Sequence, residues 1–150
     1  MEPDASATRV WLILWKAARA VEDNAKSSVA GMGLCLSDFA VLEALLHKGP
    51  QPVNVIGKTV LLTSGSITAA IDRLEGRRLV RRASDPGDRR TRIVALTAKG
   101  RRLIEEAFAR HIADMEETLA VLRPGERVEL IRLLKKAGLW AAARAEKRRP

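Results

Sequence analysis

Aromatic side chains are scarce in this sequence, whose 150 residues include no tyrosine, two phenylalanines and three tryptophans. Proteins that bind single-stranded nucleic acid stack bases on several aromatic rings, and so few rings make a platform of that kind hard to assemble. Cysteine is almost missing as well, because Cys35 is the one example and cannot form a disulfide within the chain. A reducing compartment fits that count.

Long apolar runs are missing too. No segment approaches the roughly 18 to 20 apolar residues that a membrane-spanning helix needs. The N-terminal sequence MEPDASATRV begins with acidic residues and lacks the basic segment that precedes the apolar part of a secretory signal. The sequence therefore predicts a cytoplasmic protein with no membrane partner.

Acidic residues are outnumbered, with 18 Asp and Glu against 27 Lys and Arg, which gives a net charge of +9 and a pI near 10.6. Most of the excess lies between Ser64 and Arg102, where the acidic residues are Asp72, Glu75, Asp85 and Asp88. The basic residues there are Arg73, Arg77, Arg78, Arg81, Arg82, Arg89, Arg90, Arg92, Lys99, Arg101 and Arg102. Neutralisation of DNA phosphates requires such a concentration, so duplex DNA is the expected partner.

The order of secondary structure follows from apolar spacing and helix-breaking residues. With 47% hydrophobic residues, the chain is long enough for one ordinary domain. Ser37 is expected to cap the second helix, Thr97 to cap the fifth, and Pro124 to begin the sixth. The residues from Ala145 to Pro150 have nothing apolar to bury, so we expect a frayed tail. The predicted helices span 8–28, 37–47, 53–60 and 64–76, strands follow at 79–84 and 90–96 around a turn at 85–88, and two more helices begin near 98 and 124.

The helix from Ser64 to Gly76 has a small, polar outer face. Ile67, Ile71 and Leu74 are spaced to face inward. The outward residues are Gly65, Thr68, Ala69, Asp72 and Arg73, which suits close approach to another surface. In a helix-turn-helix, the second helix enters the major groove, where Ser64, Ser66 and Thr68 would meet bases or phosphates. Arg89 or Arg90 of the hairpin would reach the minor groove. The alternative is a solvated basic face on an unrelated α+β domain.

The segments ITAAIDRLEGRRLVRR, DPGDRR and VALTAKG, all between Ser64 and Gly100, resemble the winged-helix core of the multiple-antibiotic-resistance regulator (MarR) family. The resemblance extends to the order of the flanking helices. It implies a mostly α protein with a small β-hairpin: a single chain with a winged helix-turn-helix at 34–100 and dimerisation helices at 8–30 and 101–146. A homodimer would place two recognition helices in successive major grooves of a pseudo-palindromic operator.

In this family an Asp-x-Arg pattern at the wing tip places the arginine in the minor groove. Asp88 and Arg90 match the pattern, with Asp88 expected to orient Arg90 through a charge-assisted bond, and Arg89 is the fallback. Together with the helix, the predicted DNA-binding residues are Ser64, Gly65, Ser66, Thr68, Arg73, Asp88, Arg89 and Arg90.

The resemblance also implies a repressor that a small lipophilic or phenolic effector releases from DNA. The effector would lie between the first, second and fifth helices, and the candidate lining residues are Trp15, Phe39, His111 and Met115. The same side chains could equally be ordinary core. A constitutive DNA-binding or architectural protein without an effector is therefore an open alternative. Independently of the family, Trp11, Trp15 and Trp140 lie in the first and last helices, and tryptophan is typical of interfaces.

Cys35 lies between two leucines, which favours a buried, inert thiol; a redox switch through Cys35 is the alternative. Two separated histidines, His47 and His111, with one cysteine are too weak a set for zinc, so no metal site is expected. We also expect no cofactor and no catalytic residues, because no phosphate loop, paired histidine motif or nucleophile elbow occurs. The sequence therefore does not predict an enzyme.

Overall fold

The computed structural model describes residues 5–148. The predictions for the acidic first residues, 1–4, and for the end of the tail, 149–150, lie outside this range. The chain forms two compact units, Met1–Met115 and Glu116–Pro150. No helix among the described residues is long and apolar enough to cross a membrane.

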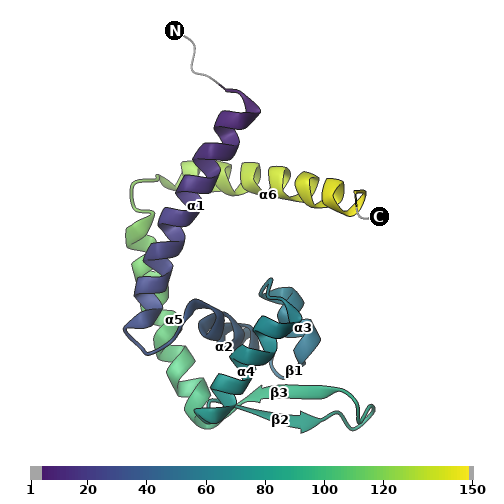
Figure 1. The fold of residues 1–150 in the computed structure, drawn as a ribbon. Coiled ribbons are helices and arrows are strands. Elements are labelled where there is room, and N and C mark those ends of the chain that lie inside the picture. The colour runs from purple at the N-terminus through teal and green to yellow at the C-terminus, as the bar shows by residue number, and fades with distance from the viewer. Residues whose placement is uncertain (1–4, 149–150) are drawn as a thin grey trace. The chain divides into compact units, whose positions relative to one another are not determined.

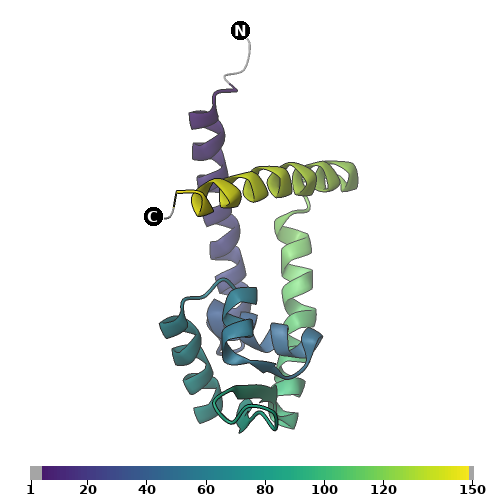
Figure 2. The ribbon, with the colours of Figure 1, turned by 90° about the vertical axis from the view of Figure 1, so that its right-hand side faces the viewer.

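Helices dominate the fold, and a short hairpin is inserted between them (Figures 1 and 2). The elements are α1 (Ala7–Ala30), α2 (Leu36–Lys48), β1 (Gln51–Pro52), α3 (Val53–Thr59), α4 (Ser64–Gly76), β2 (Val80–Ser84), β3 (Arg92–Leu96), α5 (Ala98–Thr118) and α6 (Pro124–Glu146). This order confirms the prediction of a mostly α protein with a winged helix-turn-helix. The predicted bounds of α4 and the predicted start of α6 are also confirmed.

The sheet has three antiparallel strands in the order β1-β3-β2, so it is larger than the predicted hairpin. The sequence analysis missed β1, because Gly49 to Pro52 looks like a turn. Pro52 lacks an amide donor, but a proline is tolerated in an edge strand, and β1 is one. The prediction that the second strand of the hairpin begins at Arg90 is wrong, since this strand, β3, begins at Arg92. Arg90 and Thr91 instead belong to the loop, where the carboxylate of Asp88 bonds to both.

Several helix boundaries also differ from the predictions. Ser37 does not cap α2, because the helix begins at Leu36 and Cys35 occupies the N-cap position without a side-chain cap bond. The apolar spacing after Thr97 predicts that the fifth helix includes Leu119 and Leu122, but α5 ends at Thr118 and both residues lie beyond it. The first two residues of the predicted tail are helical, since α6 continues to Glu146.

The core of the first unit lies between α2, α3, α4, the sheet and the first half of α5. As predicted, Ile67, Ile71 and Leu74 of α4 are buried. They pack in one cluster with side chains such as Leu42 of α2 and Ile104 of α5. Burial of each such side chain stabilises the fold by about 1.5 to 3 kcal/mol. α4 is therefore held on one face by the core, and its opposite face is left exposed.

The start of α5 is packed against the base of the hairpin. The hydroxyl oxygen of Thr97 accepts a hydrogen bond from the amide of Gly100 at 3.0 Å, which confirms Thr97 as the cap. The same hydroxyl donates to the carbonyl of Arg78 at 2.7 Å. A Cβ atom on Gly100 would lie 1.9 Å from the carbonyl oxygen of Leu79. Glycine is therefore the residue that allows α5 to approach β2 this closely.

Candidate nucleic-acid interface

The turn between α3 and α4 fixes how the recognition helix begins. Leu61 adopts a left-handed conformation (φ 56°), and the amide of Leu62 then donates to the carbonyl of Gly57 at 3.0 Å. This bond closes the end of α3. The hydroxyl of Thr63 accepts from the amide of Ser66 at 3.2 Å and so caps α4. Gly57 is buried against Ile67, since a Cβ at this position would lie 3.4 Å from the Ile67 side chain, and this contact packs α3 on α4.

The exposed face of α4 carries little side-chain bulk. Gly65, Ala69 and Gly76 are exposed, together with Asp72, and helical spacing places these four positions along one line. Ser64 and Thr68 flank that line on one side. The hydroxyl of Thr68 donates to the carbonyl of Ser64 at 2.9 Å, so its oxygen keeps free lone pairs as an acceptor. A surface of this shape can lie close to the floor of a groove.

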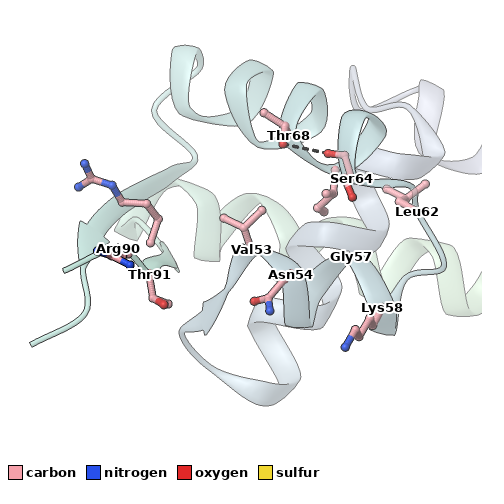
Figure 3. A pocket seen from close by; sticks show the side chains of 11 residues that line it. Val53, Asn54, Gly57, Lys58, Leu62, Ser64, Thr68, Arg90 and Thr91 are labelled. Carbon is pink, nitrogen blue, oxygen red and sulfur yellow. Dashed lines mark hydrogen bonds between the residues drawn. The ribbon is translucent and has the colours of Figure 1, made fainter. Parts of the chain in front are cut away.

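A groove of about 470 Å³ lies between α3, α4 and the hairpin (Figure 3). Ser64 and Thr68 line it from α4, and Arg90 lines it from the hairpin loop. The structure therefore brings three of the predicted DNA-binding residues to one opening. The groove is lined by Val53, Asn54, Gly57, Lys58, Leu62, Ser64, Ile67, Thr68, Arg90, Thr91 and Arg92.

Asn54 and Lys58 of α3 are polar groove residues that the sequence analysis did not select. Both are exposed, and their spacing of four residues places them on the same side of α3. Figure 3 shows the two side chains on the α3 side of the groove. Sequence reasoning could have selected them, because the first helix of a helix-turn-helix crosses the DNA backbone and these two residues are polar side chains of that helix.

The hairpin loop is organised by two aspartates. Asp85 accepts from the amide of Gly87 at 2.8 Å, and Asp88 accepts from the amide of Arg90 and the hydroxyl of Thr91, both at 2.9 Å. The bonds from the Arg90 amide and the Thr91 hydroxyl lower the pKa of Asp88 below its usual value. Asp88 thus orients Arg90 through the main chain, and not through the guanidinium bond that the family pattern implies.

The basic residues of this unit fall into two groups. Arg73 is bonded to Asp38, and Arg82 forms ion pairs with Asp72 and Glu75 at 2.5 Å each. Arg82 thereby ties β2 to α4. By contrast, the side chains of Arg89 and Arg90 are exposed and form no hydrogen bond or ion pair with the described residues. These two arginines are therefore free to meet an outside anion. A DNA contact by Arg73 stays a prediction.

The predicted effector residues are only partly brought together. The rings of Phe39 and His111 lie 4.7 Å apart, and Phe39 is almost fully buried in the core. His111 also contacts the hydroxyl of Ser28 through Nδ1 at 3.1 Å. Met115 lies one turn further along α5 and is half-buried. Trp15 is half-exposed on α1, where its ring stacks with Trp11 at 6.5 Å.

Cys35 is exposed, so the prediction of a buried thiol is wrong. The adjacent Leu34 takes the buried position, and the N-cap geometry directs Cys35 outward. Its sulfur lies 3.1 Å from the Ser37 hydroxyl and 3.7 Å from Nη2 of Arg73. Among the described residues, no group of three or more His, Cys, Asp or Glu is placed to hold a metal ion.

Comparison with known proteins adds the family to this geometry. The sequence model of the MarR family matches residues 32–91. The HTH-type transcriptional regulator MhqR of Bacillus subtilis (strain 168) is 38% identical over 133 residues, which cover 89% of this chain and 92% of MhqR.

Solved structures agree with this assignment. BpsR of Bordetella bronchiseptica, whose DNA binding is regulated by 6-hydroxynicotinic acid, has a TM-score of 0.79 at 29% identity over 87% of this chain and 98% of BpsR. A mutant MarR from E. coli, complexed with operator DNA, has the same fold, with a TM-score of 0.80 at 22% identity over 86% of this chain and 93% of that protein. On these grounds the chain belongs to the MarR family of transcriptional regulators.

Proposed function

We propose that this protein is a dimeric repressor that binds a pseudo-palindromic operator and is released by a small lipophilic or phenolic effector. The groove between α3, α4 and the hairpin carries the proposal. There, the hydroxyls of Ser64 and Thr68 line the same opening as Arg90, whose side chain forms no hydrogen bond or ion pair with the described residues. Acceptors for base edges and a free cation for the sugar–phosphate backbone are thus combined in one surface.

Each part of this surface has a proposed role. The first turns of α4 would enter the major groove, with Gly65 allowing close approach and Ser64, Ser66 and Thr68 meeting base edges or phosphates. Because the Thr68 hydroxyl already donates to Ser64, its oxygen would accept from the amino group of adenine or cytosine.

The wing and α3 would bind beside the major groove. Arg90 would enter the minor groove, with Asp88 holding its main chain and Arg89 nearby. Asn54 and Lys58 of α3 would bind phosphates.

Dimerisation is proposed from apolar surface that each unit leaves uncovered. In the first unit, Trp11 of α1 is 62% exposed and Trp15 is 51% exposed. In the second unit, Trp140 of α6 is 69% exposed, and Val128 and Leu139 are exposed as well. Large side chains of this kind are costly in water and are enriched at interfaces, so a second copy of the chain is the proposed cover.

The proposal also includes regulation, in which a small effector releases the protein from DNA. BpsR is regulated by a hydroxylated aromatic acid, and this supports a small aromatic effector for the present protein as well. The proposed site is the contact of α1, α2 and α5 around Trp15, Phe39, His111 and Met115. Because the Phe39 ring is packed in the core, the ligand would have to favour a conformation in which this packing opens. A ligand shifts the protein toward the state that it binds better, and here that state would bind DNA less well.

Selection of genomic DNA fragments tests the operator part directly. The bound fragments should share two inverted half-sites about one helical turn apart, bound by two chains. Light scattering of the free protein should give the mass of a dimer, and Trp15→Glu should lower it. Fragments without a repeated half-site, or one chain per site, would contradict dimeric operator binding. A panel of phenolic compounds in an operator gel shift then tests release: if none weakens binding, a constitutive DNA-binding protein is the better description.

Redox control through Cys35 is the second candidate, favoured by the exposure of the thiol and its proximity to Arg73. Operator binding by wild type and Cys35→Ser would be compared in the presence of peroxide. Release of the wild type alone supports this candidate. Equal release of both proteins, or of neither, excludes it.

A further inference from the structure

Arg77, the residue that follows α4, is bonded to the end of the first helix. Its Nη1 donates to the carbonyl oxygen of Gly33 at 2.7 Å. Gly33 has a φ of +68°, and the amide of Leu34 donates to the carbonyl of Val29 at 3.3 Å, which closes the end of α1. Gly33 belongs to the α1–α2 junction, by which we mean the connection 31–35 together with the first turn of α2 as far as Asp38. The end of the recognition helix is therefore bonded directly to this junction.

Arg73, one helical turn before Arg77, reaches the same junction. Its Nη2 lies 2.6 Å from Oδ1 of Asp38, and its Nε lies 3.4 Å from Oδ2. The Asp38 side chain is 6% exposed and the Arg73 side chain 49% exposed. The carboxylate is thus fixed by the core, and the arginine is fixed by the carboxylate. Removal of the arginine would leave a buried charge without its partner.

The start of α5 is bonded to the same end of α4. Lys99 donates from Nζ to the carbonyl oxygen of Arg77 at 3.0 Å. The hydroxyl of Thr97 donates to the carbonyl oxygen of Arg78 at 2.7 Å. The last turn of the recognition helix is therefore the point where α1, through the junction, and α5 are both attached. Its first turns, which line the groove, lie at the opposite end.

We infer that Arg73 and Arg77 are positioning residues that fix the tilt of α4 to α1 and so set the distance between the two recognition helices of a dimer. This inference rests on the proposed function of dimeric operator binding. A helix of 13 residues is about 20 Å long, so a tilt of roughly 3° about its attached end moves the other end by about 1 Å. A shift of that size is enough to weaken hydrogen bonds to base edges.

Binding of DNA with altered half-site spacing tests the inference. The probes are the duplex that wild type selects from genomic DNA and two versions with one base pair added or removed between the half-sites. Arg77→Ala should bind the selected duplex about tenfold more weakly, within the range of typical couplings between sites. It should also discriminate less between the three spacings. Its salt dependence should stay that of wild type, because no phosphate contact is lost.

Arg102→Ala is the matched control, since it removes an exposed arginine whose side chain forms no bond with the described residues. It should keep the wild-type preference for spacing. Arg73→Ala should repeat the effect of Arg77→Ala, and a thermal melt establishes that each variant is folded.

Two results would overturn the inference. The first is that Arg77→Ala binds the selected duplex as tightly as the wild type does and discriminates between the three spacings equally well. The other is a reduced salt dependence in Arg77→Ala, which would make Arg77 a phosphate contact. If the wild type itself binds all spacings equally, the proposed dimeric binding fails, and the inference fails with it.

Discussion

The C-terminal end of α4 and the tip of the wing are both rich in arginine, but the structure uses the two regions differently. Arg73 and Arg77 at the end of α4 are bonded to Asp38 and to the Gly33 carbonyl, and Arg82 of β2 is bonded back to Asp72 and Glu75 of α4. Arg89 and Arg90 at the wing tip have no partner among the described residues. A count of basic residues therefore overestimates the number of arginine side chains that have no partner within the described part of the protein. The bonded arginines hold α4 and the wing in place, and the arginines at the wing tip are the ones left exposed for an external partner.

The largest expected effect comes from disturbing the packing at the base of the wing. Gly100→Ala places a methyl group against the Leu79 carbonyl, 1.9 Å away before relaxation. The backbone must shift, and we expect a loss of about 3 kcal/mol in the free energy of unfolding, the upper end for overpacking. Gly125→Ala is the control, because a Cβ there meets nothing within 4 Å. Equal unfolding midpoints in urea for both variants would contradict the close packing of α5 on β2.

The pairing of Arg73 with Asp38 is the next largest effect. Arg73→Ala leaves the buried carboxylate without its strongest donor, and we expect a loss of about 2 kcal/mol. Combining Arg73→Ala with Asp38→Ala should cost less than the sum of the single changes, because the second removes the charge that the first leaves unpaired. Additive losses in urea unfolding would show that the two side chains do not stabilise each other.

Thr68→Ala tests the exposed side of the recognition helix. If the hydroxyl oxygen accepts from a base, the variant should lose about 1 kcal/mol of discrimination at one operator position. Binding of operators with single substitutions would locate that position. A uniform loss over all sequences would assign Thr68 to a phosphate instead.

The smallest effect concerns pH at the wing tip. The pKa of Asp88 is lowered by the Arg90 amide and the Thr91 hydroxyl, so its carboxylate is charged in the folded loop at pH values above its usual pKa of 3.8. The contribution of Asp88 to loop stability is therefore complete above that value and is lost as the pH falls through the lower folded pKa. The NMR chemical shift of the Arg90 amide should change with pH only below pH 3.8 and stay constant near neutral pH. A titration above that value would contradict the bonding of the loop.

Sequence patterns predicted α4 well because its apolar spacing is regular and its bounds are marked by small and hydroxyl residues. They failed at β1, because a two-residue strand is stabilised by pairing with β3 and leaves no local pattern. They also failed at Cys35, since its neighbours are apolar while the direction of its side chain depends on the N-cap geometry.

Ser64, Thr68 and Arg90 were selected from the sequence because their residue types suit DNA, and the structure places all three at one groove. The bond partners of Arg73, Arg77 and Arg82 could not be found in this way. They depend on contacts between elements far apart in the chain, such as that between Asp38 and Arg73, whose sequence positions differ by 35.

The salt dependence of operator binding tests most directly whether free and bonded arginines have different roles. Affinity would be measured over a range of salt concentrations for wild type, Arg90→Ala and Arg82→Met. We predict that the slope of log K against log salt falls by about 0.9 in Arg90→Ala, because its cation in the minor groove would neutralise one neighbouring phosphate, and is unchanged in Arg82→Met. An unchanged slope in Arg90→Ala, or an equal fall in both variants, would contradict the division between arginines that bind DNA and arginines that hold the fold.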